Sequence, residues 1–179
     1  MTGIEFFLTK QIYGPEQHPH GWDKYVYDDE NIHYALLQLL SESCPAFAQK
    51  LLGLSESPER VSVFPKPKRG LFDLQFTADD MIIFCEVKVW ASLSEDQFLR
   101  QTTFLKEQNA KGIYVLFTKA ADAWPSTVVL ERSEGRCRVV GVQELSDALG
   151  AVETEIPAEV AEVAAAYRSV LKSIGARRW

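Results

Sequence analysis

An acidic and a basic side chain stand two positions apart inside an apolar stretch of the chain. Residues 82–90 read IIFCEVKVW, with Glu86 and Lys88 in the middle. Burying one charge costs several kcal/mol unless a partner or a metal ion compensates it. Because side chains alternate between the two faces of a strand, Glu86 and Lys88 project to the same side. The pair therefore belongs either to an exposed edge strand, where charges oppose aggregation, or to a site that performs chemistry.

A third charged residue, Asp73, lies on the segment that precedes this stretch. GLFDLQF alternates, TADD is typical of a turn, and MIIFCEVKVW follows, so the sequence predicts a β-hairpin. With a two- or four-residue loop centred on Ala78 and Asp79, Asp73 faces position 84. Glu86 is then its diagonal neighbour, with α-carbons roughly 7–8 Å apart. A loop of odd length would put the two carboxylates on opposite faces.

Two carboxylates on one face are suited to a hard divalent cation such as Mg²⁺, which prefers oxygen ligands. Such an ion compensates the carboxylates, which in turn compensate Lys88. A metal ion beside an ammonium group fits the hydrolysis of a phosphodiester. The ion polarises the phosphoryl oxygen and activates water, while the lysine orients that water or stabilises developing charge.

The segments that must position these residues alternate between helix and strand. Apolar residues at 32, 35, 36, 39 and 40 predict a one-faced helix, with Asp28 or Asp29 as its N-cap. Residues 61–64 and 112–118 read as strands, and Ser94 begins a helix that extends to about residue 109. The order of helix, three strands, helix and strand predicts an α/β domain with a mixed sheet.

The C-terminal part continues with TVVLER and RCRVVGV, which flank Ser-Glu-Gly and predict a second hairpin. A short helix, QELSDAL, comes next, and Pro157 starts a long amphipathic helix. Its apolar stripe consists of Val160, Val163, Ala164, Tyr167, Leu171 and Ile174. The stripe packs on its own sheet or docks on a partner or a second copy, which would make a homodimer. We expect one domain over residues 1–179, with a core at about 28–118 and the strands and helix of 125–175 packed on it.

Composition restricts the class of protein. The 179 residues are 46% hydrophobic and 25% charged, which suffices for one domain with its own core. No apolar run approaches the ~18 residues of a membrane span, and MTGIEFFLTKQIYG does not resemble a signal peptide. Cys44, Cys85 and Cys137 are unclustered, which predicts reduced thiols and a cytoplasmic location. The net charge of −6 argues against loose, non-specific nucleic-acid binding, so DNA contact would depend on a local basic patch.

The charged residues of the hairpin resemble the core motif of a known family. Asp73, twelve intervening residues and Glu86-Val87-Lys88 are similar to the motif of the PD-(D/E)XK nuclease superfamily. Many members have a glutamate on the helix before the hairpin, where Glu30 stands here. Many have a glutamine on the helix after the lysine strand, and Gln97 follows Lys88 by nine residues. The order of elements over residues 28–118 is also similar. One departure is Phe72, which stands where the family often has proline.

The resemblance implies a restriction-endonuclease-like core, a mixed β-sheet flanked by helices, and a nuclease that hydrolyses DNA phosphodiester bonds with Mg²⁺ or Mn²⁺. The implied catalytic residues are Asp73, Glu86, Lys88 and Gln97. The implied metal ligands are Asp73, Glu86, the Val87 carbonyl and, directly or through water, Glu30. Phosphate contact would come from the basic segment upstream of Asp73, namely Lys66, Lys68 and Arg69. The alternative function is a catalytically inactive protein that keeps the nuclease fold as a protein- or nucleic-acid-interaction module.

Several of these residues also have a purely structural interpretation. Ser94 and Gln97 fit the S-x-x-E/Q capping box, which would turn the glutamine side chain back to the helix N-terminus. Glu30 can be explained as an acidic residue at the start of a helix, where the helix dipole favours negative charge. Gln101 can be explained as a solvated residue of the helix surface, or as a residue that contacts phosphate. The basic residues within 66–69 can be explained as a solvated loop.

Overall fold

The computed structural model of the chain describes residues 30–65, 71–89 and 91–176, without the side chains of residues 30, 31, 118–120 and 173–176. The helices and strands follow one another as α3 (Glu30–Ser43), α4 (Pro45–Leu52), β1 (Val61–Pro65), β2 (Leu74–Ala78), β3 (Met81–Lys88), α5 (Glu95–Glu107), β4 (Lys111–Leu116), α6 (Thr118–Ala123), α7 (Ser126–Arg132), β5 (Cys137–Gly141), α8 (Val142–Ala151) and α9 (Ala158–Ala176). The predicted order of helix, three strands, helix and strand is therefore present. A second short helix, α4, stands before β1, as PAFAQKLLGL predicts.

The five strands form one open mixed sheet in the order β1-β2-β3-β4-β5. The first three strands pair antiparallel, whereas β4 pairs parallel to β3 and β5 parallel to β4. The α/β class and the mixed sheet are confirmed. Strand β3 is the central strand, with β2 on one side and β4 on the other.

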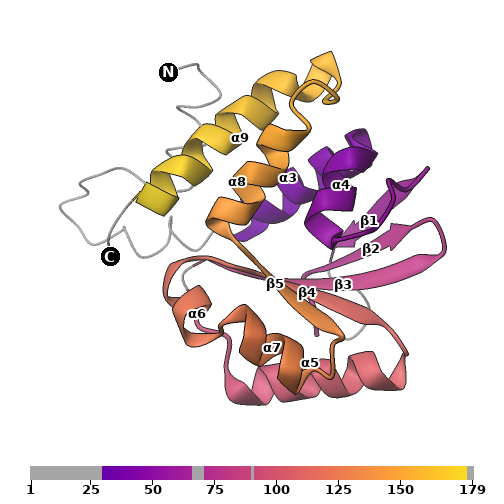
Figure 1. Ribbon diagram of the computed structural model, residues 1–179, viewed down its shortest axis with the longest axis vertical. Helices are drawn as coiled ribbons and strands as arrows, with labels where there is room; N and C mark the ends of the chain where they lie inside the picture. Colours follow the sequence, from indigo (N-terminus) through magenta and orange to yellow (C-terminus); the bar gives the residue numbers. More distant parts are fainter. Residues whose placement is uncertain (1–29, 66–70, 90, 177–179) are drawn as a thin grey trace.

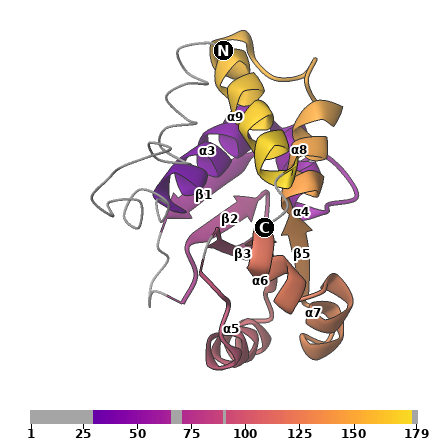
Figure 2. The same ribbon diagram turned by 90° about the vertical axis from the view of Figure 1, so that its left-hand side faces the viewer.

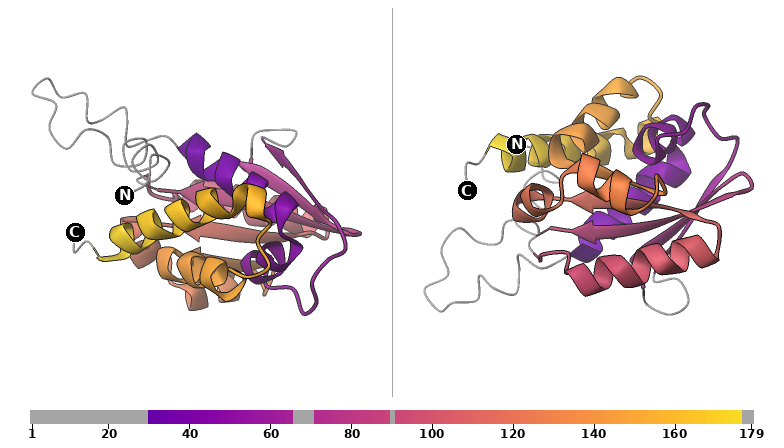
Figure 3. Two further views of the ribbon diagram at one scale, coloured as in Figure 1. Left: turned by 90° about the horizontal axis from the view of Figure 1, so that it is seen from above. Right: turned by 60° about the horizontal axis from the view of Figure 1, so that its bottom comes forward.

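Helices cover both faces of this sheet. Figures 1 and 2 show α3, α4, α8 and α9 on one face, and α5, α6 and α7 on the other. The right-hand view of Figure 3 shows α5 running alongside the strands. We call these the α9 layer and the α5 layer. The two layers enclose separate hydrophobic clusters, one on each face of the sheet.

The larger cluster lies beneath the α9 layer and is almost wholly apolar. Odd-numbered residues of β3, such as Cys85 and Val87, point into it together with Phe76 of β2. One polar pair sits inside it: the Nδ1 atom of His33 and the hydroxyl of Tyr167 are 2.7 Å apart and hydrogen-bonded. This layer anchors the hairpin that carries the charged residues.

The long C-terminal helix α9 packs the described part of its apolar stripe within the chain, while the side chain of Ile174 lies outside the description. Ala164, Tyr167 and Leu171 are all 3% exposed or less and belong to the cluster of the α9 layer. Figure 1 shows α9 lying along α8 and above α3. The intramolecular packing of the stripe is therefore the arrangement observed, and the homodimer through this helix remains an untested prediction.

The hairpin between β2 and β3 turns through two residues, Asp79 and Asp80, because Ala78 pairs with Met81. Asp79 adopts a positive φ of 50°. Its carboxylate accepts hydrogen bonds from the backbone N–H groups of Glu59 and Arg60. The loop has an even length, as expected, but its centre is one residue later than predicted. Continued past its last pair, Leu74 and Cys85, this register would set position 73 opposite Glu86 rather than opposite position 84.

The predicted second hairpin is wrong. Residues 127–132, TVVLER, belong to helix α7, and only residues 137–141 form a strand. The physical reason is the direction of that strand: β5 is parallel to β4. A parallel pair cannot be joined by a tight turn and needs a crossover, which α6 and α7 provide here. Val129, one of the β-branched residues, is the buried anchor of α7.

The structure bears on two further predictions, which concern the cysteines and the membrane spans. Cys44, Cys85 and Cys137 are all free and buried. Burial raises the pKa of the Cys85 thiol well above its ordinary value, with a further rise from the Asp73 charge. None of the helices in the described part of the chain has the length and apolar composition to span a membrane.

Candidate active site

The charged residues of β3 lie in the middle of the sheet, so the edge-strand interpretation is wrong. Glu86 pairs with Tyr114 of β4 in a parallel ladder, and β2 lies on the other side of β3. Glu86 is 2% exposed, and the side chain of Lys88 is 13% exposed. Both even-numbered side chains point away from the apolar α9 layer and toward α5. The pair therefore requires compensation within the fold.

Asp73 lies where β2 departs from β3. The ladder ends at the pair Leu74 and Cys85, and the N–H of Asp73 donates to the carbonyl oxygen of Cys85 at 3.0 Å, one residue off the ladder register. The Oδ2 atom of Asp73 accepts from the backbone N–H of Val87 at 2.9 Å. The carboxylate thus takes the place of the next backbone acceptor of β2. This bond fixes the Asp73 side chain beside the Glu86-Val87-Lys88 segment.

The carboxylate of Glu86 receives three donors. The Nζ atom of Lys88 lies 2.5 Å from Oε1, and the Nε2 atom of Gln97 donates to the same oxygen at 2.6 Å. The Nε2 atom of Gln101 donates to Oε2 at 2.8 Å. A buried carboxylate is stable only with such partners. Residues from β3 and α5 therefore build one polar cluster inside the α5 layer.

The electrostatics of this cluster favour the protonated form of Glu86. Burial, and next the negative charge of Asp73, raise the pKa of Glu86 from 4.5 to about 7. The hydrogen bonds and charge of Lys88 and the hydrogen bond from Gln97 act in the opposite direction. Two carboxylates that repel one another in a poorly solvated place are an arrangement that a cation would stabilise. This is the chemistry expected of a metal site.

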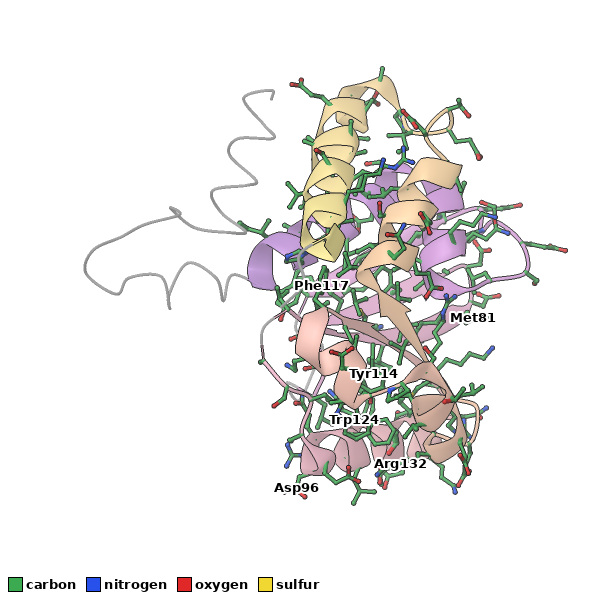
Figure 4. All side chains as sticks on the ribbon, turned by 60° about the vertical axis from the view of Figure 1, so that its left-hand side comes forward. Met81, Asp96, Tyr114, Phe117, Trp124 and Arg132 are labelled. Atoms are coloured by element: carbon green, nitrogen blue, oxygen red, sulfur yellow. The ribbon has the colours of Figure 1, made fainter. Side chains whose placement is uncertain are left out.

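The N-cap and the apolar packing of helix α5 place both of its glutamines next to Glu86. Ser94 is its N-cap, and the serine side chain accepts from the backbone N–H of Gln97 at 3.2 Å. Phe98 is buried and packs on the rings of Tyr114 and Trp124, with centroids 5.7 and 4.6 Å away. Figure 4 shows Tyr114 and Trp124 on the α5 side of the sheet and Phe117 toward α9. Residues four apart on a helix share a face, so Gln97 and Gln101 point together at Glu86.

The observed contacts of Gln97 and Gln101 differ from the structural interpretations given for them above. Gln97 does not complete a capping box, since its side chain amide donates to Glu86 instead of turning back to Ser94. Gln101 is not solvated surface but fully buried, and it donates to Glu86 and to the Leu71 carbonyl oxygen. The sequence did carry the signal for Gln101: two amides with i, i+4 spacing follow a strand that buries a carboxylate.

Several predicted site residues cannot be placed beside Glu86. The described part of helix α3 starts at Glu30, whose side chain lies outside the description, as do the predicted N-cap residues Asp28 and Asp29. Lys66, Lys68 and Arg69 also lie outside the described residues. The structure thus brings together Asp73, Glu86, Lys88 and Gln97. The proposed roles of Glu30 and of the basic residues Lys66, Lys68 and Arg69 remain predictions.

Within the described residues, no group of three or more His, Cys, Asp and Glu side chains could hold a metal ion. Asp73 and Glu86 make two. Two carboxylates nevertheless fit Mg²⁺, which keeps several waters and binds through one or two carboxylates plus substrate phosphates. The Val87 carbonyl, which the family resemblance adds, belongs to the residue whose N–H already bonds Asp73. The donor set therefore suits a hard cation with an incomplete protein shell.

Two cavities lie away from this cluster. One of about 470 Å³ is lined by residues of α8 and α9, including Leu149 and Arg168. Another of about 780 Å³ surrounds the hairpin tip at Asp79 and Asp80. Neither contains Glu86, whose surroundings are packed. Asp73, Lys88 and Gln97 are only partly buried, so they are the members of the cluster that a substrate would reach first.

The chain matches no protein-family model, and it matches no curated protein either. An account of its function therefore depends on the residues and geometry of the cluster itself.

Proposed function

We propose that the protein is a Mg²⁺- or Mn²⁺-dependent nuclease that hydrolyses DNA phosphodiester bonds, with a restriction-endonuclease-like fold. One observation carries the proposal: Asp73, Glu86 and Lys88 gather where β2 leaves the ladder with β3. The Asp73 carboxylate is bonded to Val87 N–H, and its charge acts on Glu86. Lys88 contacts Glu86 at 2.5 Å. These are the three residues that carry the resemblance to the PD-(D/E)XK superfamily.

The arrangement of the elements supports the same proposal. An antiparallel hairpin carries the acids, a helix follows the lysine strand, and the next strand returns parallel to it. Because β3 is central, Glu86 stands on the best-supported part of the sheet, and Asp73 is bonded to the same strand at Cys85 and Val87. This order is what the resemblance implies for a restriction-endonuclease-like core.

In this proposal each residue has a separate role. Asp73 and Glu86 hold the cation, with the Val87 carbonyl and Glu30 as the further ligands that the resemblance implies. A bound Mg²⁺ would polarise the phosphoryl oxygen and increase the acidity of a coordinated water. Lys88 positions the attacking water or stabilises charge that develops on phosphate. Gln97 keeps the Glu86 carboxylate oriented by its 2.6 Å hydrogen bond.

Cleavage of plasmid and branched DNA with Mg²⁺ or Mn²⁺ tests the proposal. Wild type is compared with Asp73→Asn, whose remaining amide oxygen can still accept from Val87 N–H, and with Lys88→Ala. Matched controls are Glu134→Gln and Lys106→Ala, an exposed pair at 2.8 Å elsewhere on the chain. We expect wild type and the controls to cut and the two site variants to lose at least a hundredfold in rate. Equal cleavage by all five proteins, or none by wild type, would contradict catalysis at this site.

A second candidate is the inactive nuclease-fold interaction module, and the three donors on Glu86 favour it. Lys88, Gln97 and Gln101 satisfy the carboxylate without a metal ion. Calorimetric titration with Mg²⁺ separates the two functions. A nuclease site binds the ion in wild type and not in Asp73→Asn, whereas the interaction module shows no heat in either.

A further inference from the structure

The side chain of Gln101 connects the two segments that carry the acids. Its Nε2 atom donates to the Leu71 carbonyl oxygen at 2.6 Å and to the Oε2 atom of Glu86 at 2.8 Å. Leu71 is two residues before Asp73, in the segment that enters β2. Gln101 itself is 0% exposed. One buried amide therefore spans the entry to β2 and the carboxylate of β3.

The orientation of this amide is determined by its partners. The Leu71 backbone carbonyl can only accept, so the nitrogen must face it, and the ionised carboxylate of Glu86 accepts from the same nitrogen. The Oε1 atom then points the other way, and it is buried without a hydrogen-bond partner among the described residues. An unsatisfied buried acceptor is costly and uncommon. Retaining it indicates that the two bonds made by the nitrogen matter for this part of the fold.

The second glutamine of α5 makes a smaller contribution. Gln97 is only half-buried, and its side chain donates to Glu86 at 2.6 Å. That bond lies within the pair of β3 and α5. It does not connect the segment that bears Asp73. The two glutamines therefore differ in kind, although they share a helix face.

We propose that Gln101 is the positioning residue of the site, which fixes the distance between the Asp73 and Glu86 carboxylates by tying the 71–73 segment to Glu86. This inference rests on the proposed function, because the distance matters for a cation that both carboxylates hold. Groups that orient metal ligands change metal affinity or activity by about 10–100-fold when they are removed. Gln101 acts through Asp73 and Glu86 and does not touch the substrate.

The test compares Gln101→Met, which keeps the volume and removes both hydrogen bonds, with Gln49→Met. Gln49 is a matched control, because its amide also donates to a backbone carbonyl, that of Ser55, but on the surface. The first readout is the Mg²⁺ concentration for half-maximal cleavage. We expect at least a tenfold increase in Gln101→Met and no change in Gln49→Met. A purely structural role would lower the amount of folded enzyme and leave this concentration unchanged, which would overturn the proposal.

The second readout needs neither metal nor activity. Hydrogen exchange of single amides follows Asp73 N–H, bonded to Cys85, and Val87 N–H, bonded to Asp73. We expect both to exchange at least tenfold faster in Gln101→Met, while amides of β4 keep their protection. Unchanged exchange at both amides would overturn the proposal even if the protein cuts DNA. If wild type does not cut DNA, the proposed function fails, and faster exchange still shows that Gln101 positions the segment. If Gln101→Met does not fold, Gln101→Leu provides the same comparison, since leucine also lacks a donor for either partner and adds no charge.

Discussion

The two faces of strand β3 differ in what they bury. Cys85 and Val87 point into an apolar cluster, whereas Glu86 and Lys88 point toward α5 and enter a cluster of polar partners. Both sets are well shielded from water, with Val87 at 0% and Glu86 at 2% exposure. The strand therefore combines an anchoring face with a chemical face, and neighbouring residues of one segment serve opposite purposes.

The difference shows how the site is held in place. On the α9 side, stability comes from apolar surface removed from water and from close packing. On the α5 side, each polar group depends on a particular partner, so the loss of one partner leaves a buried charge or an unsatisfied bond. We expect substitutions on the two faces to fail in different ways, and the following predictions separate them.

The largest effect is expected on the apolar face. Phe76 is 0% exposed within the cluster of the α9 layer, so Phe76→Ala should lower the free energy of unfolding by about 3–5 kcal/mol. Urea unfolding measures it. Phe64 on the neighbouring strand is 53% exposed, and Phe64→Ala should change stability by less than about 1 kcal/mol. A similar cost for both would contradict the assignment of the two faces.

The next effect depends on pH and belongs to the chemical face. The pKa of folded Glu86 is about 7, above its ordinary 4.5. The protonated form is therefore favoured by folding, and this contribution is complete below pH 4.5 and lost as the pH rises through 7. In buffers without divalent ions, wild type should lose about 3 kcal/mol relative to Glu86→Gln between pH 4 and pH 8. Urea unfolding of both proteins across this range provides the measurement, and a constant difference between them would contradict the burial of the charge.

A smaller effect is expected for the ammonium group. Removing the partner of a fully buried ion costs about 3–5 kcal/mol. Lys88 is slightly exposed, and Glu86 keeps two amide donors. Lys88→Met should therefore cost roughly 2 kcal/mol at pH 8 and clearly less at pH 5, where Glu86 is protonated. Thermal and urea unfolding at the two pH values test this. The exposed Lys106, replaced by methionine, should show no comparable cost at either pH.

Much of the arrangement on β3 could be predicted from the sequence, because a strand has a simple period. The alternation placed Glu86 and Lys88 on one face, and the short turn at Asp79 and Asp80 preserved the even loop length. Ser94 predicted the start of α5 because serine is a favoured N-cap residue, and the structure shows that cap. These features depend on residues close together in the chain, where local rules are strong.

Other features depended on contacts that are distant in the chain. The β-branched residues of TVVLER favour a strand locally, but the parallel direction of β5 requires a helix there. The i, i+4 spacing of Gln97 and Gln101 indicates a shared face toward Glu86, but the bond of Gln101 to Leu71, thirty residues earlier, cannot be derived from the sequence of α5 alone. The hairpin turns at Asp79 and Asp80 rather than at Ala78 and Asp79. Local sequence patterns cannot distinguish turns that differ by one residue, so the register could not be predicted.

The central claim is that Asp73 and Glu86 together hold a divalent cation. Crystals grown with Mn²⁺ and measured at its absorption edge test this most directly. We predict an anomalous peak within coordination distance of both carboxylates, absent from crystals of Asp73→Asn. A peak that avoids both side chains, or no peak while Lys88, Gln97 and Gln101 still surround Glu86, would contradict the claim.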